Sequence, residues 1–172
     1  MAAVAIGLKN MYMGPVAGDG GMGLSLELVA NAVEGTPVLN FEEGDKTDFN
    51  IEQSNDPYYS ITNPGNKVLT LSIYGVSPAL MYKYFGGTIV IGATSADADV
   101  WSAPATFPDL EKSIVLTHNQ GGHLKIVRGK VSALAVWNFQ KAALPQIDLT
   151  ITILTPTKTN EPPMVFSTAT YP

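Results

Sequence analysis

Strict alternation of apolar and polar residues is the feature that most constrains the fold of this chain. In 66–74, leucine and isoleucine hold the odd positions from 69 onwards, and Thr70, Ser72 and a tyrosine hold the even ones. In 147–154, isoleucine and leucine again alternate with polar residues. Successive side chains of a strand point to opposite faces of a sheet, so each run predicts a strand with one buried and one polar face.

The same period of two recurs elsewhere and predicts an all-β fold with one short helix. Asp48, Asn50 and Glu52 alternate with Phe49 and Ile51, and a long β-rich run covers 124–139. The remaining expected strands cover 3–13, 24–33, 87–91 and 113–118.

The helix is expected over 78–85, where the alternation stops. Ser77 suits the N-cap and Pro78 the first helical position, while Gly86 and Gly87 favour a left-handed end. The apolar residues between them form one stripe, so we expect this helix to lie over a sheet face. The residues of that stripe are Leu80, Met81, Tyr84 and Phe85.

A single domain over 1–172 is expected, because the chain has 172 residues and no internal repeat or linker stands out. Within it, 1–23 forms an N-terminal strand and loop, and 155–172 forms an extended C-terminal arm. That arm contains Met164, Val165 and Phe166, which are unfavourable in water, so we expect it to dock on its own or another subunit. Loops are expected at 14–23, 53–66, 93–109 and 119–123.

The composition excludes several classes of protein. The chain has no cysteine, which rules out disulfides and thiolate chemistry. Its net charge is −5, with nine acids and two lysines giving −7 in residues 1–60 and six bases and three acids giving +3 in 111–172. A chain that grips nucleic acid needs a basic stripe, which is missing. No signal-like or membrane-spanning stretch is visible, so we expect a soluble protein made in the cytoplasm, without membrane insertion.

The glycine-rich segment at 18–23 formally matches the dinucleotide-binding pattern G-x-G-x-x-G, with Glu42 and Glu43 about twenty positions later. Such a site requires a helix directly after the glycines, but LSLELVANAV alternates as well as it fits a helix. Repeated βαβ units are also missing. The segment is therefore interpreted as a flexible loop.

Other motifs indicate neither catalysis nor cofactors. His118 and His123 flank a turn, which is typical of surface histidines, and no third metal ligand has suitable spacing. Acids at 45, 48 and 52, or at 97 and 99, lack the spacing of a calcium loop. Signatures of nucleophilic or zinc hydrolases and of P-loops are missing. We expect no enzyme, no metal and no cofactor, although a carboxylate dyad remains an open alternative.

The opening VAIGLKNMYMGPVAGDGGMG, followed by ALAVWNFQKAALPQIDLTITILTPTK, resembles the major tail tube proteins of long-tailed bacteriophages. This resemblance implies a β-barrel or sandwich subunit with one flanking helix. It also implies hexameric rings whose strands join one continuous inner barrel, and rings that stack into a conduit for DNA ejection in the virion tail, assembled in the host cytoplasm. The implied partners are further copies of the chain, the tail terminator, the tape measure, the baseplate or initiator proteins and passing DNA, which is not bound specifically.

The alternation independently favours assembly, because joining strand edges between subunits removes exposed edges. Small polar residues on one strand parity are the candidates for the lumen: Asp48, Asn50, Glu52, Thr70, Ser72, Ser132, Asp148, Thr150 and Thr152. The other parity, with Phe49, Ile51, Leu69, Leu71 and Ile73, should hold this layer. A neutral to acidic wall would not grip phosphates.

Assembly contacts are expected from the N-terminal segment, the 53–66 loop and the C-terminal arm. The candidate residues are Asp56, Tyr58, Tyr59, Asn63, Met164, Val165 and Phe166. Three alternatives remain open: another structural or adhesion-type β-sandwich, such as a fibre, pilus or capsid-decoration module; the inner tube of a contractile injection system; and an enzyme or ligand-binding barrel.

Overall fold

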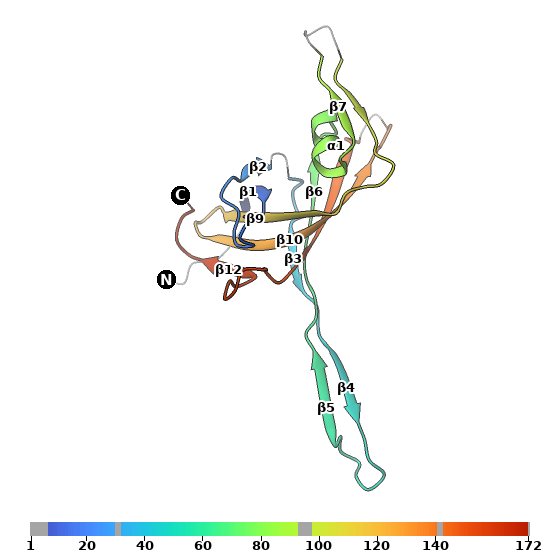
Figure 1. Ribbon diagram of the computed structural model, residues 1–172, viewed down its shortest axis with the longest axis vertical. Helices are drawn as coiled ribbons and strands as arrows, with labels where there is room; N and C mark the ends of the chain where they lie inside the picture. The colour runs from blue at the N-terminus through green and yellow to red at the C-terminus, as the bar shows by residue number, and fades with distance from the viewer. Residues whose placement is uncertain (1–6, 30–31, 93–97, 141–142, 172) are drawn as a thin grey trace.

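Strands dominate the computed structural model, which describes residues 7–29, 32–92, 98–140 and 143–171 (Figure 1). The prediction of a mainly β fold with one short helix is therefore confirmed. The elements in chain order are β1 (Leu8–Pro15), β2 (Glu27–Val29), β3 (Val38–Phe41), β4 (Asp45–Phe49), β5 (Tyr59–Asn63), β6 (Lys67–Tyr74), α1 (Pro78–Phe85), β7 (Thr88–Val90), β8 (Val100–Ser102), β9 (Leu110–His118), β10 (His123–Val136), β11 (Gln146–Ile153) and β12 (Met164–Ser167).

The main sheet has the order β2-β1-β9-β10-β11-β6-β3, and neighbouring strands are antiparallel. Its longest strand, β10, pairs with β9 along one edge. The other edge of β10 pairs first with β12, at residues 123–126, and then with β11, at residues 129–136. The sheet is open and does not close into a barrel within one chain.

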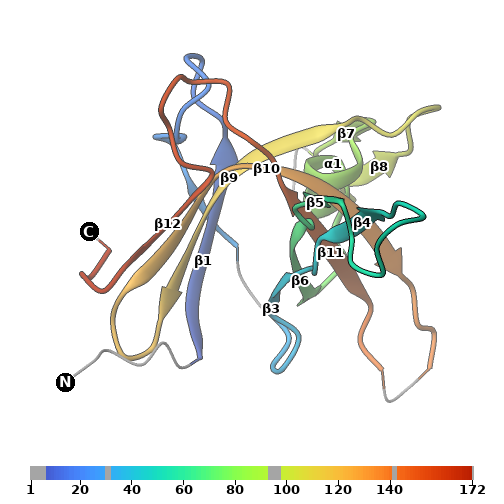
Figure 2. The same ribbon diagram turned by 90° about the horizontal axis from the view of Figure 1, so that it is seen from below.

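Because β10 is long and bends, the sheet divides into two wings (Figure 2). The first wing contains β2, β1, β9, the first half of β10 and β12. The second wing contains the second half of β10, β11, β6 and β3. The alternation seen in the sequence determines which side chains face inwards, since a strand shows alternate residues to the two faces of its sheet.

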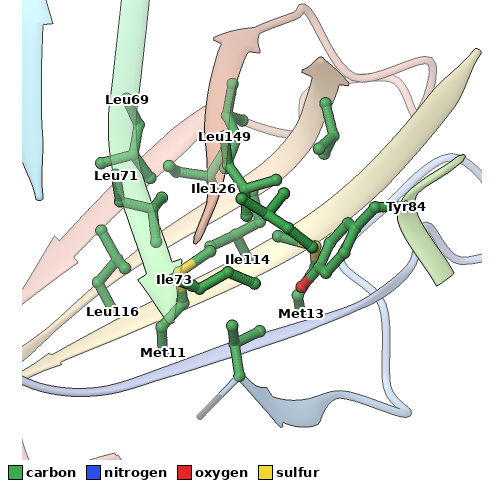
Figure 3. Close-up of a cluster of buried hydrophobic side chains, with 14 of the residues drawn as sticks. Met11, Met13, Leu69, Leu71, Ile73, Tyr84, Ile114, Leu116, Ile126 and Leu149 are labelled. Carbon is green, nitrogen blue, oxygen red and sulfur yellow. The ribbon is translucent and has the colours of Figure 1, made fainter. Parts of the chain in front are cut away.

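The core lies between the two wings. In Figure 3, Leu71 and Ile73 of β6 point towards Met11 of β1 and Ile114 of β9. Helix α1 closes one end of this space with Met81, Tyr84 and Phe85, so it covers a sheet face as expected. Burial of these apolar side chains is the main favourable term of the fold.

Helix α1 has the bounds that the sequence predicts. The backbone N–H of Leu80 donates to the hydroxyl of Ser77 over 3.3 Å, which identifies Ser77 as the N-cap. Gly86 ends the helix at a φ of 69°, a value that glycine adopts readily. The indole of Trp101, on β8, donates to the carbonyl of Gly86 over 2.7 Å and ties the β7–β8 ribbon to the helix end.

Three predicted boundaries were wrong. The expected loop at 53–66 contains β5, and the expected loop at 93–109 contains β8. Of the strand expected over 24–33, residues 30 and 31 lie outside the described residues, and among the others only Glu27–Val29 pair with β1, as β2. Of the strand expected over 3–13, residues 3–6 lie outside the described residues. The first two errors share a cause, since β5 and β8 are stabilised by pairing with a partner strand and not by their own composition.

Candidate functional site

The second wing carries a polar face opposite to its core face. We define the polar face by the six side chains that β6, β10 and β11 contribute to it: Thr70, Ser72, Ser132, Asp148, Thr150 and Thr152. They are all lumen candidates from the sequence, and strand pairing brings them together. Ser132, Thr150 and Thr70 lie in one cross-strand row, and Asp148 lies opposite Ser72 in the next. The residues between them, such as Leu71 and Leu149, are buried.

Side-chain hydrogen bonds tie the polar face together. The hydroxyl of Ser72 donates to a carboxylate oxygen of Asp148 over 2.6 Å, and the amide of Gln146 donates to the same oxygen over 2.9 Å. Lys130 shares the strand parity of Ser132, and its ammonium lies 3.0 Å from the carboxylate of Asp109. This surface therefore carries few charged side chains, and each of them has a hydrogen-bond or ion-pair partner nearby.

Apolar side chains also occur on the polar face, and the lumen candidates did not include them. Leu134, which lies opposite Asp148, is 63% exposed, and Val38 of β3 is exposed opposite Thr70. Leu134 and Ser132 have the same parity in the sequence, so the alternation alone contained the signal that identifies this exposed leucine. The polar face is a mixed surface at its β10 side.

Both outer edges of the second wing lack a partner strand within the described part of the chain. Strand β9 follows β10 only as far as the pair Leu110–Val131, so residues 132–136 pair on one side only, with β11. At the other end of the wing, β3 pairs only with β6. Exposed strand edges are templates for pairing with another chain.

The two open edges are displaced along the strand direction. Val38 of β3 lies in the row of Thr70 and Ser132, and β3 runs from this row towards Phe41, beside Lys67. The open part of β10 runs from the same row in the opposite direction, towards Val136. Strands that close into a barrel need a stagger of this kind.

Residues 42–66, here called the arm, project from the sheet as a two-stranded ribbon of β4 and β5 (Figure 1). At its root, a Cβ on Gly44 would overlap the carbonyl oxygen of Asn63, and a Cβ on Gly65 would overlap that of Glu42. Glycine at both positions allows the two chains to pass this closely. Every side chain of β4 and β5 is exposed.

The two faces of the arm differ in character. On one face, Phe49 lies opposite Tyr59, with ring centroids 6.2 Å apart, and Thr47 lies opposite Ile61. On the other face, Ser60 donates to Asp48 over 2.5 Å, and Lys46 lies 3.0 Å from the same carboxylate. The hydrogen bond from Ser60 and then the lysine lower the pKa of Asp48.

The sequence candidates on the arm are all exposed, and the structure does not bring them to the polar face. They are the lumen candidates Asp48, Asn50 and Glu52 and the assembly candidates Asp56, Tyr58, Tyr59 and Asn63. One expectation is corrected here. Phe49 and Ile51 do not hold a buried layer within the chain, because they lie exposed on the arm, whereas Leu69, Leu71 and Ile73 are buried.

The C-terminal segment, expected from the sequence as an extended arm over 155–172, docks on its own chain. Strand β12 pairs with residues 123–126 of β10, with Met164 half-buried against the core and Val165 and Phe166 exposed. Beyond it, Tyr171 lies edge-on to His123, whose Nδ1 is 2.9 Å from the carbonyl oxygen of Ala169. His123 is only 6% exposed, so the expectation of a surface histidine was wrong for this residue: the tail covers it.

The glycine-rich loop at 18–23 packs against the segment that leads to β12. The ammonium of Lys158 lies 3.0 Å from the carboxylate of Asp19, and this contact is the main cause of the lowered pKa of Asp19. Gly20 has a φ of 79° and faces Thr157 so closely that a Cβ would overlap the threonine hydroxyl. The chain between the loop and β2 is irregular, and the helix that a dinucleotide site requires is not formed over residues 24–29.

Neither a metal-binding cluster nor a helical membrane span occurs among the described residues. No group of three or more histidine, aspartate or glutamate side chains there is arranged to hold a metal ion. Within the same ranges, none of the helical residues forms a span long and apolar enough to cross a membrane.

A cleft of about 690 Å³ lies between α1, the end of β1, β2 and residues 104–108. Glu27, Lys83 and Lys112 are its charged residues. Nearby, burial raises the pKa of Tyr84 to about 12, so this phenol stays protonated at neutral pH.

In comparisons with known proteins, the chain matches no family model and no curated protein sequence.

Proposed function

We propose that this chain is a structural subunit of a phage-type tail tube. In this proposal, copies join edge to edge into rings around a channel lined by the polar face, and the rings stack into a conduit for DNA. The observation that carries the proposal is the second wing, which combines a polar face with an open strand edge on each side. In a monomer, the two edges beside this polar face would leave backbone N–H and C=O groups without a partner strand and open to pairing with another chain.

Strand direction supports closure into a ring. The second wing contributes four strands, β10, β11, β6 and β3, and each is antiparallel to its neighbour. With an even number of alternating strands, β3 of one copy meets β10 of the next in the antiparallel sense. Head-to-tail repetition of this contact closes a barrel when the rotations between successive copies add up to a full turn. The displacement of the two edges supplies the stagger that a closed barrel needs.

The chemistry of the polar face suits a wall past which DNA moves. Fixed lysines and arginines on a channel wall would bind phosphates and release counterions, which creates affinity and slows transit. The polar face instead offers hydroxyls and a carboxylate, and Lys130 beside it is paired with Asp109. Such a wall leaves the DNA backbone hydrated.

The arm supports contact between stacked rings. A two-stranded ribbon without a core is marginally stable in water, and this one exposes Phe49, Tyr59 and Ile61 on a single face. Exposed apolar faces of this kind mark interaction sites. Covering that face with a neighbouring subunit would order the arm and bury the three side chains.

Size-exclusion chromatography with light scattering, followed by negative-stain electron microscopy, tests the proposal. We expect rings or hollow tubes from the purified chain at high concentration. The double variant Phe49→Ser/Tyr59→Ser should form no stacked tubes while its melting temperature stays unchanged, because the proposed role of the arm is contact with the adjacent ring and the arm does not support the core. The control, Thr62→Ala on the other face of the arm, leaves the charge of the arm unchanged and should still assemble. A wild-type chain that remains a compact monomer at every concentration would refute the proposed function.

A further inference from the structure

The residues that line the cleft beside α1 lie outside the second wing, whose open edges are proposed to close the ring, and their chemistry indicates a binding site. Its walls include the apolar or backbone-rich residues Pro15, Tyr82, Pro104 and Pro108. It is large enough to admit a protein segment with one or two inserted side chains. A concave, mostly apolar site with a small number of charged groups is the usual form of a binding pocket.

The charges of the cleft leave a positive excess. The ammonium of Lys83 lies 2.7 Å from the carboxylate of Glu27. This hydrogen bond is the main cause of the lowered pKa of Glu27, and the charge of Lys112 lowers it further. One carboxylate therefore lies among two lysines, so a second carboxylate that enters the cleft would meet an attractive field.

The tip of the arm has the complementary character. Residues 50–58 contain two acids, Glu52 and Asp56, and no basic residue. Tyr58 lies at this tip, and it is 75% exposed. The tip also has a defined shape, because the N–H of Tyr58 donates to the carbonyl of Phe49 over 2.8 Å.

The tip of the arm lies at one end of the molecule, far from α1, the helix that lines the cleft (Figure 1). In Figure 1, the arm leaves the sheet on the side away from α1, and the cleft lies beside α1. A protruding segment and a complementary hollow at separate places on one subunit make a heterologous contact, which repeats from copy to copy without closing when the copies are stacked. The occupant that fits this arrangement is a second copy of the chain.

We propose that the cleft between α1, β1 and β2 binds the arm tip of a subunit in the adjacent ring. Tyr58 enters between Tyr82 and the prolines, and Glu52 or Asp56 pairs with Lys112. This inference rests on the proposed function, since it specifies which surface of the neighbouring ring receives the arm.

Cysteine crosslinking provides a direct test, because the chain contains no cysteine of its own. Tyr58→Cys combined with Thr106→Cys, which lines the cleft, should give a ladder of disulfide-linked oligomers under mild oxidation. Tyr58→Cys combined with Lys9→Cys, an exposed position outside the cleft, serves as the control and should give none. Equal ladders from the two pairs, or no ladder from the first pair in assembled tubes, would overturn the cleft assignment.

Charge exchange gives an independent measurement. Lys112→Glu should raise the protein concentration needed for tube formation by roughly tenfold or more, as expected for loss of an interfacial ion pair. Adding Asp56→Lys to that variant should restore part of the loss, whereas Lys9→Glu should leave assembly unchanged. Wild-type tubes that form and are unaffected by Lys112→Glu refute the cleft but leave the proposed function standing. A wild-type chain that forms no tubes refutes both.

Discussion

Substitution of Gly20 by alanine should destabilise this protein strongly, although the residue lies in a surface loop. Gly20 has a φ of 79°, and a Cβ there would overlap Thr157 Oγ1 and approach the backbone nitrogen of Lys158 to 2.9 Å. A left-handed conformation costs a residue with a Cβ about 1–2 kcal/mol, and overpacking costs about 1–3 kcal/mol more. The sum, about 2–5 kcal/mol, corresponds to a melting temperature lower by roughly 5–15 °C for a chain of this size.

Gly18 is the matched control in the same motif. A Cβ at position 18 meets no atom within 4 Å, so Gly18→Ala should leave the melting temperature almost unchanged. Thr157→Ala added to Gly20→Ala should recover the part of the loss due to overlap but not the part due to φ. Thermal unfolding followed by circular dichroism measures all four proteins. If Gly18→Ala were as destabilising as Gly20→Ala, packing against residues 157–158 would not explain the glycines of this loop.

Two further predictions concern polar groups. The hydroxyl of Tyr84 is buried and has no hydrogen-bond partner among the described residues, so Tyr84→Phe should raise stability by about 1 kcal/mol in denaturant unfolding; a loss of more than that would indicate a partner for the phenol. The pKa of Glu111 is lowered chiefly by its hydrogen bond from Arg128, so this pair stabilises the fold above the ordinary pKa of 4.5 and the contribution is lost as pH falls below it. Melting temperatures measured from pH 6 to 3 should therefore fall less steeply in Glu111→Gln than in the wild type, and identical slopes would exclude this role.

Much of the fold follows from local patterns because those patterns report burial directly. The odd positions of 69–73 are buried and the even positions are not, as a period of two requires. Helix α1 was predicted to the residue because its cap, first-turn proline and terminal glycine are all local signals. In both cases the physical cause lies within a short stretch of chain.

The arm shows where such reasoning fails. Alternation of Asp48 with Phe49 was interpreted as a strand packed on a core, but the same pattern belongs equally to a ribbon whose apolar face is uncovered. Periodicity indicates that a strand has two different faces, but it does not indicate what covers the apolar face. The open edge of β10 could not be predicted from the sequence either, because it depends on where β9 begins to pair, at Leu110. Register between distant strands is a tertiary property that no local pattern contains.

The acidity of the chain is located on the arm and not on the polar face. Residues 42–66 contain six acids and one lysine, a net charge of −5, which equals the net charge of the whole chain. On the polar face, Asp148 is held by two hydrogen bonds, and Lys130 beside this face is held by an ion pair, so the surface is close to neutral. In the proposed tube, DNA would then pass because fixed cations are scarce along the wall, without needing strong repulsion. Repulsion would instead act between the arms of adjacent subunits, and each arm would be stable only where lysines of the next ring compensate its charge. Passage of DNA and polymerisation of rings would thus depend on separate surfaces of one subunit, and only the second should respond strongly to the charge of the arm.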